Sequence, residues 1–178
     1  MISLSPTPVL ETERLILRAP LGSDWPHWRA FHETDRALMI GGGPDQPAGQ
    51  SWRAFGHVIG HWAMRGFGMF VLTRREDPQP LGLIGPWFPD GWPEPEIGWT
   101  IWSPEAEGRG YAHEAATAAR RHAFADLGWK TAVSYIRADN ARSIALAERL
   151  GAVRDDTAAI PDAIADCLVY RHPKRGAA

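Results

Sequence analysis

Hydrophobic and polar residues alternate in one early segment of the chain and recur at helical spacing in several later ones. Residues 12–19 read TERLILRA, and Leu15, Leu17 and Ala19 fall on one side of an extended chain, so we expect a strand with one mostly buried face. Ser23 is a typical N-cap residue, so a helix is predicted from there to about residue 32, with a proline in its first turn.

A second helix and three strands are predicted in the next part of the chain. Residues 51–65 carry apolar side chains at helical spacing, and Gly66 is suited to end that helix. Before it, the run GGGPDQPAG at 41–49 breaks regular structure. The three strands are predicted at 67–73, 81–87 and 96–102, with breaks at 77–80 and 89–95.

Helices and strands then alternate toward the C-terminus. Four elements are predicted: a helix at 110–127 closed by Gly128, a strand at 131–137, a helix at 140–150 between Asn140 as N-cap and Gly151, and a strand at 166–171. Alanines at 112, 116, 119 and 123 form a stripe that lets the first of these helices lie close to a sheet. This order predicts an α/β fold, a mixed sheet with helices on both faces.

Composition narrows the function classes. The 178 residues suit one compact domain, and the formal net charge of -2, with both signs interspersed, argues against nucleic acid and anionic membranes as partners. The N-terminus lacks a secretory pattern and no apolar run is long enough for a membrane span, so a cytoplasmic protein is expected. The single cysteine, Cys167, lies in an apolar segment and is expected to be a core residue in a reducing compartment.

The stretch EGRGYAHEAA at 107–116 carries the first chemical signal. A turn with Gly108 and Gly110 that leads directly into a helix leaves backbone N–H groups unpaired at the positive end of the helix dipole. The two glycines let the backbone approach a phosphate group without Cβ atoms in the way. His113 stands where the dinucleotide fingerprint needs a third small residue, and no Gly-Lys-Ser/Thr follows. The turn alone is equally compatible with a purely structural role.

A second motif follows about 30 residues later. Residues 140–151 read NARSIALAERLG, and together with the glycine turn they resemble the GNAT superfamily of acyl-CoA N-acyltransferases. The pyrophosphate loop of that superfamily reads Gln/Arg-x-x-Gly-x-Gly/Ala, and its later helix begins with asparagine. The segments TERLILR, RGFGMFVL, PLGLIG and EIGWTI look like the RimJ/RimL branch, named for acetylation of ribosomal-protein N-termini. The resemblance covers about residues 11–171 in the right order.

The resemblance implies a fold, a co-substrate and a set of donor-binding residues. It implies one domain at 11–172, between an extension at 1–10 and a tail at 173–178, built on a mostly antiparallel sheet of about six to seven strands flanked by helices. It implies acetyl-CoA as co-substrate and no metal. The residues it assigns to acyl-CoA are Thr100, Ile101, Trp102, Gly108, Arg109, Gly110, Tyr111, Ala112, Asn140 and Ser143; Arg142 and Arg149 are further candidates for its phosphates.

Two positions depart from the family pattern. Glu107 stands where the loop usually has Gln or Arg, and we expect its side chain to turn away from the pyrophosphate. Ala147 stands where many members have the tyrosine that protonates the leaving thiolate, so that acid is missing.

Catalytic candidates follow from the resemblance. Glu96 is the expected base that removes a proton from the amine, with Glu94 in reserve, since an alkylamine with a pKa of about 10 is mostly charged at neutral pH. Ser143 is the expected acid toward the CoA sulfur, although a serine in a first helical turn is also an ordinary capping partner.

The acceptor remains open at this level. Trp28, His32, Trp87 and Asp156 are candidate wall residues for a cationic amine, each equally explicable as structural. Peptide N-termini, polyamines, aminoglycosides and amino-acid derivatives all satisfy that description, and either a monomer or a homodimer is compatible. Two rival functions stay open: a catalytically silent acyl-CoA-binding domain and a nucleotide-binding α/β module.

Overall fold

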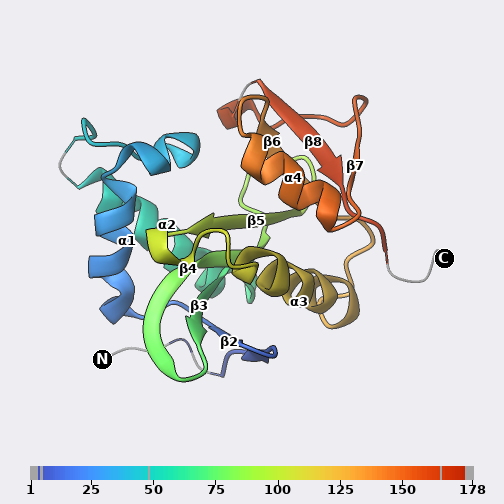
Figure 1. Ribbon diagram of the computed structural model, residues 1–178. Helices are drawn as coiled ribbons and strands as arrows, with labels where there is room; N and C mark the ends of the chain where they lie inside the picture. Colours follow the sequence, from blue (N-terminus) through green and yellow to red (C-terminus); the bar gives the residue numbers. More distant parts are fainter. Residues whose placement is uncertain (1–3, 5, 48, 165, 175–178) are drawn as a thin grey trace. The chain divides into compact units, whose positions relative to one another are not determined.

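The computed structural model, drawn in Figure 1, describes residues 4, 6–47, 49–164 and 166–174. Its chain divides into two compact units. The first unit contains residues up to Leu83 together with Thr100–Tyr111, and the second contains Ile84–Trp99 and the residues from Ala112 onward. Strands β4 and β5 therefore each contribute to both units, and all other strands belong to one.

Eight strands of the described chain form one sheet in the order β1-β2-β3-β4-β5-β6-β8-β7. Their bounds are β1 Leu10–Glu11, β2 Leu15–Arg18, β3 Phe70–Arg74, β4 Asp77–Trp87, β5 Glu96–Ile101, β6 Val133–Arg137, β7 Val153–Arg154 and β8 Cys167–Arg171. The sheet is mostly antiparallel, with β5 and β6 as parallel neighbours, which confirms the predicted fold class. The pattern missed β1 and β7, because two-residue strands are too short to show a period.

The first unit packs helices α1 (Trp25–His32) and α2 (Gln50–Arg65) against each other. The predicted stripe of α2 is buried at Phe55, Val58 and Trp62, and the helix ends at Gly66 in a left-handed conformation, as predicted. The N-cap prediction at Ser23 is wrong. Asp24 holds that position, and its carboxylate binds the Arg18 guanidinium at 2.7 and 2.8 Å.

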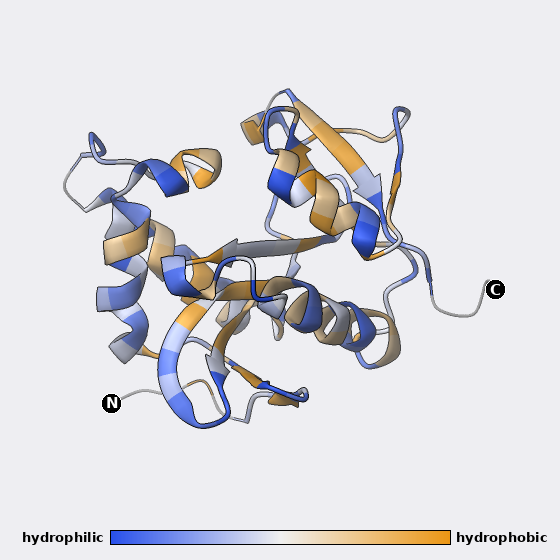
Figure 2. Cartoon of the chain, in the orientation of Figure 1, coloured by the Kyte–Doolittle hydropathy of each residue, from blue (hydrophilic) through white to orange (hydrophobic). Residues whose placement is uncertain are grey.

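The predicted break at 77–80 is also wrong. Strand β4 already begins at Asp77, and the turn after β3 consists of Arg75 and Glu76. The fixed φ of proline is compatible with an extended strand, so Pro78 and Pro80 remain within β4. Figure 2 shows this hairpin turn as hydrophilic.

The second unit covers the two faces of its sheet in different ways. On one face, α3 (Tyr111–Ala125) and α4 (Ala141–Arg149) bring Ala123 and Ala147 against sheet residues that include Ile97 and Ile136. The other face is covered by residues of connecting segments. There Val133, Tyr135, Cys167 and Val169 pack under Trp92, Ala158 and Ile164. Figure 2 shows β8 hydrophobic along most of its length, consistent with burial on both sides.

The small-residue stripe and the caps of the later helices follow the prediction. Ala116, Ala119 and Ala123 of α3 are fully buried, whereas Ala112, in the first turn of the helix, is only partly buried. Asn140 caps α4 by accepting a hydrogen bond of 3.1 Å from the backbone N–H of Ser143. Gly151 takes a left-handed φ of 77° after the helix, so both ends of α4 are where the sequence places them.

Candidate functional site

The glycine turn has the backbone conformation that the sequence predicts. Gly108 and Gly110 have φ values of 71° and 79°, a region that other residues enter only with strain, and α3 begins at the next residue, Tyr111. Arg14 holds the turn from the side of β2: it donates to the carbonyl oxygen of Arg109 at 3.0 Å and lies over the Tyr111 ring. The arginine in the turn, Arg109, folds back onto the carbonyl oxygen of Glu105 at 2.6 Å.

Arg36 belongs to the first unit, and no motif in the sequence marks it as a site residue. Its guanidinium donates to the Glu107 carboxylate at 2.5 Å and to the carbonyl oxygens of Ile101 and Trp102 at 2.8 and 2.6 Å. The charge of Glu107, the departure from the family loop, is therefore compensated inside the protein. The carbonyl groups expected to face the pantetheine arm are also occupied, so a ligand binding there would exchange bonds with Arg36.

The end of β5 makes further contacts within the first unit. The Trp102 N–H donates to the carbonyl oxygen of Leu81 at 2.7 Å, and the Trp102 indole donates to the Thr100 hydroxyl at 3.1 Å. These bonds fix the backbone direction of the three residues that the resemblance assigns to the pantetheine, Thr100 to Trp102.

Strands β5 and β6 separate almost immediately after they meet in the second unit. Their register has one pair, Glu96 with Val133. At the next position the Ser134 hydroxyl donates to the carbonyl oxygen of Ile97 at 2.6 Å, so a side chain replaces the backbone ladder. The Ser134 oxygen in turn lies 2.9 Å from Nε2 of the buried His172. The sheet thus opens beside β5 just after Glu96.

Glu96 has the properties expected of a base near neutral pH. Its side chain is half-buried, and desolvation by the surrounding protein raises its pKa from about 4.5 to about 7. Hydrogen bonds from the Trp92 indole, at 2.8 Å, and from the Tyr135 backbone oppose that rise in pKa by favouring the carboxylate. A carboxylate with a pKa near the operating pH is suited to accept a proton and release it again.

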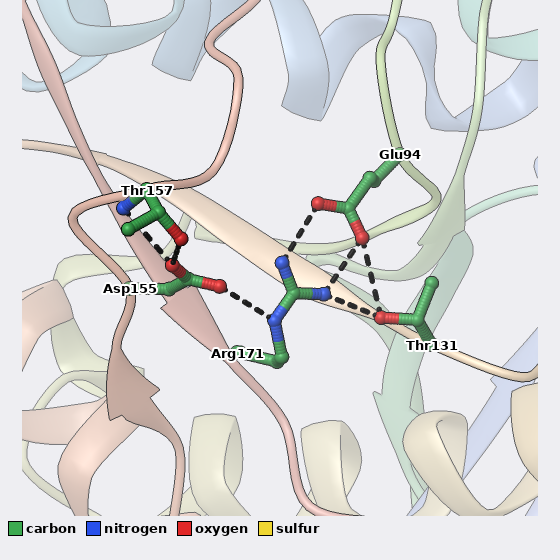
Figure 3. Close-up of polar contacts among 5 residues, drawn as sticks. All are labelled: Glu94, Thr131, Asp155, Thr157 and Arg171. Carbon is green, nitrogen blue, oxygen red and sulfur yellow. Dashed lines mark hydrogen bonds and ion pairs between the residues drawn. The ribbon is translucent and has the colours of Figure 1, made fainter.

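Glu94, the reserve base, is committed elsewhere. Figure 3 shows its carboxylate against the Arg171 guanidinium, with hydrogen bonds of 2.7 and 2.8 Å, and Asp155 on the other side of the same guanidinium at 2.8 Å. Thr131 donates to Glu94 as well. The hydrogen bonds from Arg171 lower the pKa of Glu94, which makes it a poor base and a good structural anion.

Ser143 lies in the first turn of α4, on the helix-covered face of the second unit. Its Oγ accepts a hydrogen bond of 3.1 Å from the Trp99 indole. Glu96 lies on the opposite face, because Ile97 and Trp99 pack toward the helices while Glu96 contacts Trp92 of the segment that covers the other face. The two predicted catalytic side chains therefore flank β5 from opposite faces of the sheet.

The candidate acceptor-wall residues differ in exposure. Trp28 and His32 are buried in the core of the first unit, where their rings stack at 5.0 Å and His32 Nδ1 lies 3.1 Å from the Ser51 hydroxyl. In the second unit Trp87 is half-buried, and Asp156 is exposed and pairs with Arg154 at 2.6 Å. A packing role accounts for Trp28 and His32 without a ligand.

The described residues show neither a metal-binding cluster nor a helix that could span a membrane. They contain no group of three or more His, Cys, Asp or Glu side chains placed to hold a metal ion. None of the helices formed by residues 4–174, apart from the undescribed positions, is both long and apolar enough to cross a membrane.

Comparison with known proteins gives consistent matches. Residues 14–153 match the model of the acetyltransferase (GNAT) domain. An acetyltransferase of Agrobacterium tumefaciens strain C58 is 37% identical, over 95% of this chain and 96% of its own, with a TM-score of 0.86. A Bordetella pertussis protein assigned to the GNAT acetyltransferases is 28% identical over 94% and 100% of the two chains, with a TM-score of 0.76.

A ribosomal-protein-S5-alanine acetyltransferase of Vibrio fischeri shares the fold. It is 14% identical over 96% of this chain and 98% of its own, with a TM-score of 0.69. At this identity the match supports the architecture and leaves the acceptor open.

Proposed function

The chain belongs to the GNAT family of acetyltransferases, and from this premise we propose that it transfers the acetyl group of acetyl-CoA to a primary amine by direct attack in a ternary complex. The amine belongs to a small molecule or a protein N-terminus. The observation that carries the chemical part of the proposal is Glu96, a half-buried carboxylate whose pKa is raised to about 7 at the point where β5 and β6 separate.

Donor binding is proposed at the glycine turn and along β5. The pyrophosphate accepts hydrogen bonds from the backbone N–H groups after Gly108 and Gly110, where the helix dipole of α3 favours negative charge. In the first unit, the backbone of Thr100 to Trp102 is the proposed partner of the pantetheine. In the second unit, Asn140 and Ser143, at the start of α4, are residues that the family resemblance assigns to acyl-CoA. The ion pair of Glu107 with Arg36 supports this assignment, because the guanidinium weakens the repulsion between that carboxylate and the phosphates.

The reaction conserves atoms and charge in three steps. Glu96 takes a proton from the ammonium form of the amine, directly or through water, and the neutral nitrogen attacks the thioester carbonyl carbon. A backbone N–H of β5 stabilises the resulting oxyanion. The carbon–sulfur bond then breaks, the thiolate receives a proton from the Ser143 hydroxyl, and the attacking nitrogen, which is cationic after the attack, loses its second proton to water. Ser143 regains a proton from solvent and Glu96 releases the proton that it took, so one proton is released overall. The products are the acetylated amine and CoA with a free thiol.

Binding and turnover test the proposal separately. Acetyl-CoA is expected to raise the melting temperature of the protein, and NAD and ATP at the same concentration are expected not to. A panel of amines, including peptides with free N-termini, polyamines and aminoglycosides, is then scored by release of free thiol. Stabilisation by acetyl-CoA without thiol release from any amine would favour the silent acyl-CoA-binding domain. A larger shift with a nucleotide would favour the nucleotide-binding module.

A further inference from the structure

Trp99 contacts the proposed acid from the side of the sheet. Its indole Nε1 donates to Ser143 Oγ at 3.1 Å, across a sequence separation of 44 residues. The Trp99 ring packs against the cluster that α3 buries and also against the cluster that α4 buries. The ring is therefore held by apolar contacts from both helices while its one polar atom points at the serine.

Within the described residues, the Trp99 side chain makes one polar contact, the hydrogen bond to Ser143. The edge of the ring meets His172 at 6.4 Å between centroids and an interplanar angle of 86°. His172 is buried, which lowers its pKa to about 3, so it is neutral and places no charge beside the indole. The Ser134 hydroxyl donates its hydrogen to the carbonyl oxygen of Ile97, so its oxygen can only accept from His172. The imidazole hydrogen therefore lies on His172 Nε2.

The contact determines how the Ser143 hydroxyl is used. Its oxygen accepts from Trp99, and the backbone N–H of the same residue is already bound by the Asn140 side chain. Among the described residues, no protein acceptor takes the hydroxyl hydrogen. An oxygen that accepts a hydrogen bond is also polarised toward donating its own hydrogen.

We propose that Trp99 is a positioning residue that acts through Ser143: its indole N–H orients the hydroxyl and stabilises the negative charge that develops on Oγ when the hydroxyl proton moves to the CoA sulfur. The proposal rests on the proposed function. The carbon–sulfur bond breaks, the sulfur gains the serine proton, and the transient alkoxide, held by the indole N–H, regains a proton from solvent. Trp99 itself neither loses nor gains a proton.

The test uses Trp99→Phe, which keeps an aromatic ring and removes the N–H, in a cycle with Ser143→Ala. Each single substitution is expected to lower kcat about tenfold, with little change in KM for acetyl-CoA. The double variant is expected to be no slower than Ser143→Ala, because Trp99 acts only through the hydroxyl. Trp52→Phe, an exposed tryptophan outside the proposed site, is the control and should retain full activity.

A second readout does not depend on turnover. CoA labelled with carbon-13 beside the sulfur reports the pKa of the bound thiol, and loss of the indole N–H is expected to raise that pKa by about 0.5 to 1. Ser143→Ala should raise it as well, and the two changes should not add. If wild-type protein acetylates no amine, the proposed function fails, while this titration with bound CoA still decides the role of Trp99.

Several outcomes would overturn the inference. Effects of Trp99→Phe and Ser143→Ala that add in kcat would show that the two residues act independently. If Trp99→Phe leaves the pKa of the bound thiol unchanged, Trp99 does not act through Ser143, even if kcat falls. If Trp99→Phe fails to fold, the nitrogen-15 resonance of the Trp99 indole is measured in wild type and in Ser143→Ala. CoA binding must shift this resonance in wild type and leave it unchanged in Ser143→Ala.

Discussion

The Arg36 guanidinium donates to the Glu107 carboxylate at 2.5 Å and also to the carbonyl oxygens of Ile101 and Trp102, at and just after the end of β5. Arg36→Met should therefore remove the guanidinium that compensates the charge of Glu107 beside the glycine turn. We expect affinity for acetyl-CoA, measured by calorimetry, to fall about tenfold, or roughly 1.4 kcal/mol. Glu107→Gln in the same chain should recover most of the loss. Equal affinity in wild type and Arg36→Met would remove the electrostatic argument.

Glu96→Gln should abolish the dependence of turnover on a group with a pKa of about 7. In wild type, kcat should rise with pH through that value, because only the carboxylate form accepts a proton. The variant should lose about 100-fold or more in kcat at neutral pH and show a flat profile in this range. The matched control is Glu94→Gln, which should keep the wild-type profile. An unchanged profile in Glu96→Gln would make the base assignment wrong.

The same two glutamates should affect stability with opposite signs as pH changes. The pKa of Glu96 is raised in the folded state, so the folded protein binds a proton more tightly than the unfolded chain between pH 4.5 and about 7. Its contribution to the free energy of unfolding is therefore lost as pH rises through this range. The pKa of Glu94 is lowered, so its contribution is present above pH 4.5 and is lost as pH falls below that value.

Urea unfolding at several pH values measures this difference. Glu96→Gln should be more stable than wild type above pH 7, and Glu94→Gln should be less stable by about 1 kcal/mol, since its ion pair with Arg171 is partly exposed to solvent. The two stability differences should converge toward zero at low pH. The opposite order above pH 7 would contradict the assigned pKa directions.

Gly110→Val should weaken acetyl-CoA binding strongly while the fold survives. Both Gly110 and Gly128 have left-handed φ values, 79° and 71°, so valine at either position should cost stability by about 1–2 kcal/mol or more. Gly128 lies beyond the far end of α3, so Gly128→Val controls for backbone strain and should keep wild-type affinity. Calorimetry with acetyl-CoA compares them. Equal affinity in the two variants would exclude the glycine turn as the pyrophosphate site.

Local signals predicted most of the fold. These signals involve residues close together in the sequence: the alternation of Leu15 and Leu17, the alanine stripe of α3 and the caps of α4. The structure confirms each of them. The failures are also local in origin. Ser23 has the ordinary preference for an N-cap, but an ion pair with Arg18 places Asp24 at that position.

The candidate site is predictable from the sequence only where backbone geometry determines it. The glycine turn shows in the sequence because positive φ requires glycine. The Arg36 contact with Glu107 and the Trp99 contact with Ser143 join residues 71 and 44 positions apart, and nothing in their surroundings along the chain marks the pairing. Glu96 was selected from the family pattern, but its raised pKa depends on burial beside Trp92 and Tyr135, which no spacing reveals.

Cys167 has a practical and a chemical consequence. It is the chain's only cysteine, it is buried, and burial raises the pKa of its thiol, so little thiolate forms at neutral pH. Reagents that count thiols should therefore report released CoA against a low protein background. The same burial should protect the protein from forming a mixed disulfide with its own product, so acetyl transfer should continue under mild oxidation that inactivates enzymes with exposed cysteines.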